Sequence, residues 1–288
     1  MSALDWDSDG RTWPNREQSA FVRDGPIVWH VQRAGSGPQV LLLHGTAAST
    51  HSWSELFPEL ARRFHVTAVD LPDHGFTRTH GSLKPSLTGV ASALSALLAK
   101  IDMSPDFLVG HSAGAAIAMQ MVLEAHVEPE RIISLNGAVV PFEGHASVLF
   151  PALAKAIQLN PLAAPAFAWA AKDRKRVARL IAQTGSNVSA EYIDGYARLL
   201  RSSNHVAGAL AMMANWNLAP LFRNLDRVDR PVHLLVGAND LAVPPKQAED
   251  AANRLSDASL TMLDGVGHLA HEEDARRVAT LIVDALSS

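Results

Sequence analysis

One short stretch, Gly110-His-Ser-Ala-Gly114, constrains the fold of this chain more than any other. Residues 107–109 before it are apolar and typical of a buried strand, whereas residues 113–126 after it are typical of a helix. A strand that turns at once into a helix must bend sharply, and the residue at the bend takes a strained conformation. Gly110 and Gly114 carry no Cβ, so the strand and the helix can close around the bend. The spacing therefore predicts that Ser112 is a nucleophile presented at the end of a strand.

A glycine-rich helix start with a capping serine is the alternative explanation of this stretch. The strand before it, the helix after it and the partners found downstream favour the nucleophile. In that arrangement the backbone N–H of Ala113 lies at a helix N-terminus, where developing negative charge is favoured.

A second loop supplies a partner for the Ala113 amide. Residues 39–43 form an apolar strand of the kind buried in a parallel sheet, and they run into His44-Gly-Thr-Ala-Ala-Ser49. A glycine-containing loop at the end of a central strand can direct the N–H of Thr46 toward the point that Ala113 N–H faces. We therefore predict an oxyanion hole made by Thr46 and Ala113. The alternative, an ordinary loop in which Thr46 or Ser49 caps the next helix, is less favoured beside Ser112.

The acid and the base of a catalytic triad are predicted near the C-terminus. Asp240 follows the buried strand 232–237, and His268 lies in the loop after the strand at 260–263. Functional groups of α/β sheets gather just past the carboxyl ends of such strands. Asp264 is a rival for the acid, but it lies too close to His268 in sequence to reach across. A metal pair of His268 and His271 would need a third ligand, and the acidic run 272–274 is better explained as helix-start charge.

Composition excludes several classes of protein. The chain has 288 residues, 48% of them hydrophobic, a net charge of −4 and no cysteine. These values favour one large globular domain or one domain with an insertion, and they exclude disulfides, thiolate metal sites and a cysteine nucleophile. Nothing indicates nucleic-acid binding, a signal peptide or a membrane-spanning helix, so we expect a cytoplasmic protein. The predicted chemistry requires no metal and no organic cofactor.

The regular alternation of strands and helices stops between residues 142 and 222. This segment has the character of several helices separated by prolines, and it predicts a helical cap inserted between two strands. Met212, Met213 and Trp216 have helical spacing and are predicted to face an apolar substrate pocket below the cap. The alternative is that these side chains pack the core of the cap itself.

The predicted cap is also basic. It holds eight Lys or Arg and four Asp or Glu, a net charge of +4, with a basic run at residues 172–179. The simpler explanation of this basic run is a helix face exposed to solvent. The more specific explanation is a surface that binds an anionic substrate or partner.

The chain order Ser112, Asp240, His268 is that of the α/β-hydrolase fold, which this sequence resembles from about Ser19 onward. The resemblance implies a mostly parallel eight-stranded sheet flanked by helices, with the cap after the sixth strand. The core would comprise residues 1–141 and 223–288, with an irregular arm at 1–18, and the cap residues 142–222. One departure is Asp73, where many relatives have glycine. His30 is expected on the solvent side of a strand.

The sequence also resembles the BchO family, the magnesium chelatase accessory proteins of bacteriochlorophyll biosynthesis. The similarity extends over nearly the whole chain, and the stretches that carry it are residues 44–53, 110–118, 135–138, 212–216 and 267–273. It implies a role at the magnesium-insertion stage, with a tetrapyrrole or its ester as substrate and a transient contact with magnesium chelatase. Residue chemistry by itself does not indicate a tetrapyrrole.

Three functions from different classes remain open on the sequence. The first is a serine hydrolase acting on an ester-like bond of an apolar substrate. The second keeps the same triad for C–C bond hydrolysis or perhydrolysis. The third is a non-catalytic accessory protein that binds a porphyrin or the chelatase. The complete triad argues against the third.

Overall fold

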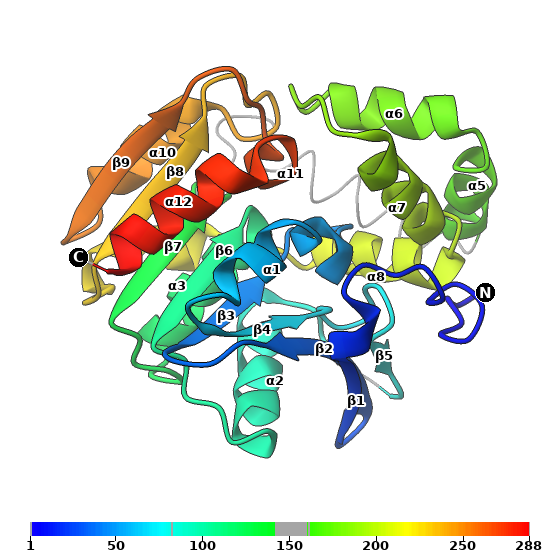
Figure 1. Ribbon diagram of the computed structural model, residues 1–288, viewed down its shortest axis with the longest axis horizontal. Coiled ribbons are helices and arrows are strands. Elements are labelled where there is room, and N and C mark those ends of the chain that lie inside the picture. Colours follow the sequence, from blue (N-terminus) through cyan, green and yellow to red (C-terminus); the bar gives the residue numbers. More distant parts are fainter. Residues whose placement is uncertain (1, 82, 142–159, 161, 288) are drawn as a thin grey trace.

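A single twisted sheet forms the centre of the molecule in the computed structural model, which describes residues 2–81, 83–141, 160 and 162–287 (Figure 1). The strand order is β1-β2-β4-β3-β6-β7-β8-β9, and all neighbours from β4 to β9 are parallel. β1 and β2 form an antiparallel hairpin, as the sequence predicts. The strands are β1 (Ser19–Asp24), β2 (Ile27–Ala34), β3 (Gln39–Leu43), β4 (His65–Val69), β5 (Arg78–Thr79), β6 (Phe107–His111), β7 (Arg131–Leu135), β8 (Val232–Gly237) and β9 (Ala258–Leu263).

The predicted mostly parallel eight-stranded sheet is confirmed, and the described residues add a ninth strand, β5. This strand has two residues and pairs only with β2. It was not expected because it lies in a loop rich in proline and glycine, where tertiary contacts rather than propensity create the pairing.

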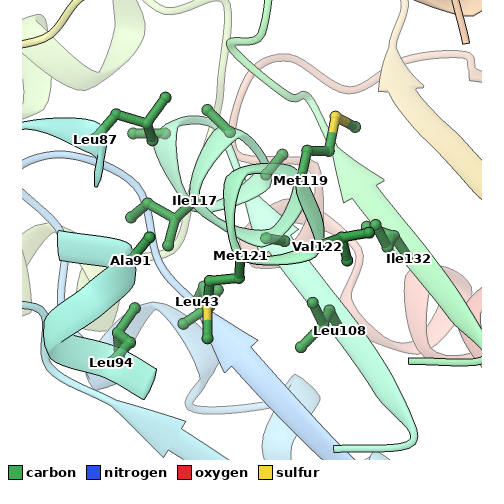
Figure 2. Packing of buried hydrophobic residues seen from close by; sticks show 14 of the residues in the cluster. Leu43, Leu87, Ala91, Leu94, Leu108, Ile117, Met119, Met121, Val122 and Ile132 are labelled. Carbon is green, nitrogen blue, oxygen red and sulfur yellow. The ribbon is translucent and has the colours of Figure 1, made fainter. Parts of the chain in front are cut away.

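Helices cover both faces of the sheet (Figure 1). One face packs against α2 (Leu87–Lys100), α3 (Ala113–Leu123) and α10 (Pro245–Ala252), and the other packs against α1 (Leu56–Leu60) and α12 (Ala275–Leu286). α3 is the most enclosed, and its side chains meet Leu43, Leu108 and Ile132 of the strands and Leu94 of α2 (Figure 2). Its alanines and glycine let it approach the sheet closely, so the start of α3 is held rigidly against the end of β6.

Within the described residues, five helices come between β7 and β8, where the sequence predicts the cap. They are α5 (Ala163–Ala170), α6 (Arg174–Ala182), α7 (Ala190–Leu200), α8 (Ser203–Ala214) and α9 (Ala219–Arg223). We call α5–α8 the cap helices, because they stand beside the sheet rather than on its faces (Figure 1). Residues 142–159 and 161 of the predicted cap lie outside the described residues. α6 and α7 share a small apolar core with Ala48 and Leu269 of the sheet domain.

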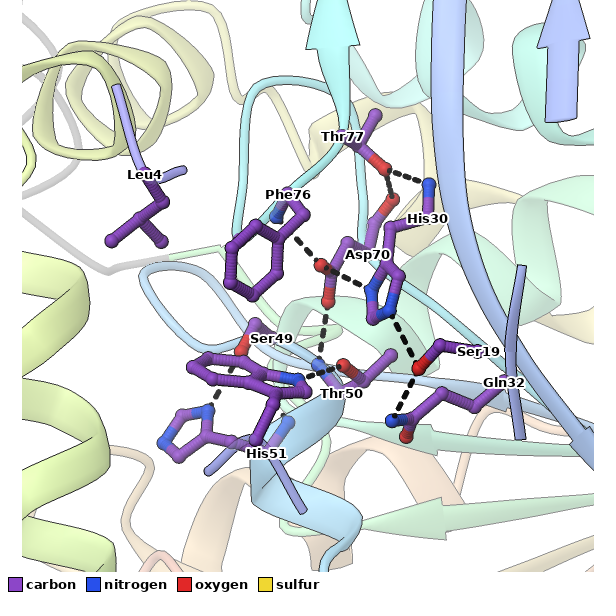
Figure 3. A network of polar contacts seen from close by, with 12 residues as sticks. Leu4, Ser19, His30, Gln32, Ser49, Thr50, His51, Asp70, Phe76 and Thr77 are labelled. Carbon is purple, nitrogen blue, oxygen red and sulfur yellow. Dashed lines mark hydrogen bonds and ion pairs between the residues drawn. The ribbon is translucent and has the colours of Figure 1, made fainter. Parts of the chain in front are cut away.

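A buried polar network fixes the loops that follow β3 and β4 (Figure 3). Asp70 accepts hydrogen bonds from Thr50 N at 2.7 Å, and from His30 Nδ1 and Phe76 N at 2.8 Å. His30 is fully buried, so the expectation that it faces solvent is wrong. The sequence could not show this, because the partner of His30 lies 40 residues away, just after β4. The loop continues through Asp73, whose φ of 59° explains why glycine suits that position.

Candidate active site

Ser112 occupies the predicted bend between β6 and α3. Its backbone has φ 52° and ψ −116°, a conformation that non-glycine residues rarely adopt. A Cβ on Gly110 would lie 2.5 Å from Ala115 N, and one on Gly114 would overlap the Leu43 carbonyl. The two glycines are therefore required for the bend, and the bend raises Ser112 above the sheet.

The structure brings Asp240 and His268 together at the same edge of the sheet. His268 Nδ1 lies 2.8 Å from Asp240 Oδ2, and both residues are buried. Ala242 N and Val243 N donate to Asp240 Oδ1, each at 2.8 Å, and Asn136 Nδ2 donates to Oδ2 at 2.8 Å. Each oxygen of the Asp240 carboxylate thus accepts two hydrogen bonds, and these bonds fix the orientation of the carboxylate. The rival acid Asp264 is exposed.

Sequence reasoning missed two residues that orient this pair. Asn136, just after β7, holds Asp240 as described, and His111, inside the elbow, donates from Nε2 to the carbonyl of His268 at 2.9 Å. Burial lowers the pKa of His111 well below its usual range, and the neighbouring His271 and His268 lower it further, so the ring stays neutral. Of these two residues, only Asn136 could be found from the sequence, because it follows the end of a central strand.

Ser112 and His268 line one cavity of about 260 Å³. Thr46 and Ala48 of the loop after β3 form part of its wall, and apolar side chains of the cap helices form another part. The apolar lining residues from α6 and α7 are Val177, Leu180, Ile181 and Leu200. Ser112 and His268 therefore open onto a space with a largely apolar lining.

The backbone amides of Thr46, in the cavity wall, and of Ala113, next to Ser112 in the chain, lack an acceptor among the described residues. Neither donates a hydrogen bond to any backbone or side-chain group within the described ranges. Ala113 opens α3, so its N–H has no partner inside the helix, and Thr46 lies in the loop that lines the cavity beside Ser112.

Met212, Met213 and Trp216 do not line this cavity. Met212 is buried, and its sulfur lies 3.8 Å from Thr46 Oγ1, so it contacts the loop after β3 without lining the cavity. Met213 is 49% exposed, and Trp216 packs against the main core. Helical spacing predicts one helical stretch for the three, but α8 ends at Ala214, before Trp216, and spacing does not show which face of a cap helix covers the pocket.

The cap is also joined to the loops of Asp240 and His268 by residues 184–186, in the turn between α6 and α7. The carbonyl of Thr184 accepts hydrogen bonds from Leu241 N at 3.1 Å and His268 N at 3.4 Å. Gly185 packs so closely on Gly267 that a Cβ on Gly267 would overlap its backbone. One turn of the cap therefore fills the space between the loop of Asp240 and the loop of His268.

Comparison with known proteins agrees with this fold. A family model described as the alpha/beta hydrolase family matches residues 40–281. The chain belongs to the alpha/beta hydrolase family. The fold class expected from the sequence is thereby confirmed.

Individual relatives of this alpha/beta hydrolase carry different names. It is 40% identical over 276 residues to the magnesium-chelatase 30 kDa subunit of Rhodobacter capsulatus, covering 95% of this chain and 96% of that one, which confirms the second resemblance. It is 25% identical to a monoacylglycerol lipase of Mus musculus over 265 residues, or 89% of this chain and 77% of that one. A solved esterase of Thermogutta terrifontis has a TM-score of 0.76 at 20% identity, covering 94% and 98% of the two chains. An esterase of Exiguobacterium antarcticum has a TM-score of 0.76 at 16% identity, covering 93% and 99%.

The described part of this alpha/beta hydrolase shows no group of three or more His, Cys, Asp or Glu side chains placed to hold a metal ion. No helix within the same residues is long and apolar enough to cross a membrane.

A buried acid lies behind the cavity of this alpha/beta hydrolase. Glu272, in α11 (Ala270–Glu273), accepts hydrogen bonds from Tyr196 OH at 2.7 Å and from Ser52 Oγ. Burial raises the pKa of Glu272 to about 8, although these hydrogen bonds lower it. Of the predicted helix-start charges at residues 272–274, Asp274 accepts a hydrogen bond from Arg277 N, whereas a charge is disfavoured on Glu272, because Glu272 is buried and its pKa is raised. It instead fixes Tyr196, which lines the cavity.

Replacing Glu272 with Gln should make the protein less sensitive to alkaline pH. The pKa rises from 4.5 to about 8 on folding, so between these values the folded state holds a proton that the unfolded state has lost. Stability from this group is therefore complete below about pH 4.5, falls by about 1.4 kcal/mol per pH unit, and is lost above about pH 8. Urea unfolding at several pH values should show the advantage of Glu272→Gln growing from pH 5 to pH 8. A difference in free energy of unfolding between the two proteins that stays constant with pH would contradict this prediction.

Proposed function

We propose that this protein is a serine hydrolase that cleaves an ester-like bond of an apolar substrate. The observation that carries the proposal is the strained Ser112 opening onto the same cavity as His268, whose far nitrogen is held by Asp240. A nucleophile, a base and an orienting acid in this relation are the parts that acyl transfer requires.

The proposed mechanism assigns one role to each part. His268 Nε2 takes the proton from Ser112 Oγ as the oxygen attacks the carbonyl carbon of the substrate. Asp240 keeps the proton of the neutral ring on Nδ1 and stabilises the imidazolium that forms. The amides of Thr46 and Ala113 donate to the oxyanion. The histidine then protonates the leaving oxygen, and a water molecule, activated by the same ring, releases the acid from Ser112.

The shape of the cap favours a substrate larger than a simple acyl ester. A second cavity of about 480 Å³ shares Val177, Leu180 and Leu200 with the first, so the two adjoin across α6. Arg176 and Arg179 contribute to its lining. An apolar body in these cavities with a carboxylate beside the two guanidinium groups would be complementary to the site.

The finer proposal is that the protein serves the magnesium-insertion stage of bacteriochlorophyll synthesis. Its support is the 40% identity to a protein named as a magnesium-chelatase subunit, together with the basic cap and its apolar cavities. A tetrapyrrole combines a wide apolar face with carboxylates, and its ester would offer the bond that Ser112 attacks. The chelatase itself is the proposed transient partner.

Deletion of the gene in a photosynthetic host tests this proposal. We expect less bacteriochlorophyll and an altered pool of porphyrins before magnesium insertion, measured by pigment extraction and chromatography. The wild-type gene should restore both, and the gene with Ser112→Ala should not. Unchanged pigments in the deletion strain would contradict the proposed role in the pathway.

Labelling of the purified protein by a fluorophosphonate tests the proposed chemistry. A protein that the probe leaves unlabelled would contradict the proposal that it is a serine hydrolase.

A second candidate is a non-catalytic accessory protein that binds a porphyrin or the chelatase. The word subunit in the name of the Rhodobacter capsulatus relative favours it. Restoration of pigment by the Ser112→Ala gene would select this candidate over the hydrolase.

A further inference from the structure

The loop that holds Thr46 is held in turn by a histidine of the cap. His205, near the start of α8, is fully buried, and its Nε2 lies 3.1 Å from the carbonyl oxygen of Ala47. The N–H of Gly75 donates to its Nδ1 at 3.1 Å. His205 thus bridges the loop after β3 and the loop after β4, neither of which belongs to the cap.

These two partners determine which nitrogen carries the proton. Burial, with the nearby His74 ring, lowers the pKa of His205 well below its usual range, so the ring is neutral at physiological pH. Nδ1 accepts from Gly75 N–H, so Nε2 carries the hydrogen and donates it to the Ala47 carbonyl. The bond has a defined direction: the cap is the donor and the loop is the acceptor.

The bond from His205 reaches Thr46 through two peptide groups. The Ala47 carbonyl belongs to the same rigid peptide as the N–H of Ala48, and that N–H donates to the Gly45 carbonyl at 3.2 Å. The Gly45 carbonyl belongs to the same peptide as the N–H of Thr46, and in a trans peptide the two groups point in opposite directions. Fixing the first peptide therefore fixes the direction of Thr46 N–H.

Two further observations show that the loop needs this support. Ala47 has φ 63°, a left-handed conformation that is strained for alanine, and a loop released at its carbonyl can relax from it. His44 holds the Gly45 carbonyl from the other side, with its Nδ1 at 2.7 Å. The peptide that carries Thr46 N–H is thus clamped between a histidine of the sheet domain and, through Ala48, a histidine of the cap.

We propose that His205 is a positioning residue of the oxyanion hole, which directs Thr46 N–H through the peptide groups of Ala47 and Gly45. The inference rests on the proposed hydrolase function, because it gives Thr46 N–H a role in stabilising the oxyanion. It makes the cap a part of the catalytic apparatus as well as a cover for the substrate.

Two substitutions of His205 separate the two bonds. Asparagine places its amide where Nδ1 stands, so His205→Asn keeps an acceptor for Gly75 N–H and loses the donor to Ala47. Glutamine places its amide near Nε2, so His205→Gln keeps a donor to Ala47. We expect His205→Asn to lower kcat for p-nitrophenyl butyrate by ~10- to 100-fold with KM changed less than about threefold, since the oxyanion contact strengthens in the transition state. His205→Gln should recover most of kcat.

Controls distinguish failure of this inference from failure of the hydrolase proposal. His126→Asn, at the far end of α3, should leave kcat unchanged. Hydrogen exchange of the amides of residues 45–48 should be faster in His205→Asn than in wild type or His205→Gln, a readout that needs no turnover. Equal kcat or equal exchange in the two His205 variants would overturn the inference. A wild-type protein without turnover or labelling would overturn the hydrolase proposal. The hydrogen-exchange data would still show whether His205 holds the loop at residues 45–48. If His205→Asn does not fold, His205→Ala replaces it with the same expected loss.

Discussion

Ser112→Ala should abolish ester hydrolysis, lowering kcat by ~10⁶-fold, the order seen when a triad serine is removed. Alanine keeps the Cβ and hence the backbone strain at φ 52°, while Gly110 and Gly114 still permit the bend, so the fold should not change. The measurement is turnover of p-nitrophenyl butyrate together with fluorophosphonate labelling, and both should disappear.

A matched control for this substitution is Ser92→Ala, on the outer side of α2, which should behave as wild type. Circular dichroism and thermal unfolding should coincide for all three proteins. Equal labelling of wild type and Ser112→Ala would show that another residue is the nucleophile.

Asp240→Asn should lower kcat by about 10⁴-fold, because the surroundings of Asp240 force the amide into one orientation. Ala242 N and Val243 N donate to Oδ1, so the amide oxygen must stay there and the NH₂ must replace Oδ2. The NH₂ then faces His268 Nδ1, which becomes an acceptor, and the ring proton moves to Nε2. A histidine in that tautomer cannot accept the proton of Ser112.

The control for the acid is Asp264→Asn. Asp264 is exposed, so its substitution should change turnover less than about twofold. Steady-state kinetics on both variants decide the assignment. A large loss in Asp264→Asn with none in Asp240→Asn would identify Asp264 as the acid.

The elements that could be predicted from sequence are those whose cause is local. The bend at Ser112 depends on an apolar strand, two glycines and a helix within a dozen residues, and the buried strands are continuous apolar runs. Asp240 and His268 were identified because both follow strands, and parallel strands bring their carboxyl ends to one edge of the sheet.

The features that could not be predicted depend on partners far apart in the chain. The sequence predicts helix-start charge at Glu272 and does not show its burial, because its partner Ser52 is 220 residues away. The sequence predicts His30 on the solvent side because its partner Asp70 lies 40 residues away, just after β4. The sequence predicts a cavity wall of Met212, Met213 and Trp216, whereas α6 and α7 supply it, because helical spacing reveals an apolar face but not what that face covers.

The turn at residues 184–186 has a consequence for how such a protein can change during evolution. Its Thr184 carbonyl joins the loops of Asp240 and His268, and Gly185 leaves no room for a side chain at Gly267. A new cap acquired by recombination would lack these contacts. The loops of Asp240 and His268 would then no longer be held by a common hydrogen-bond acceptor. New substrate preferences are therefore open to gradual substitution along α6 and α7, while exchange of the whole insertion requires matching changes in the histidine loop.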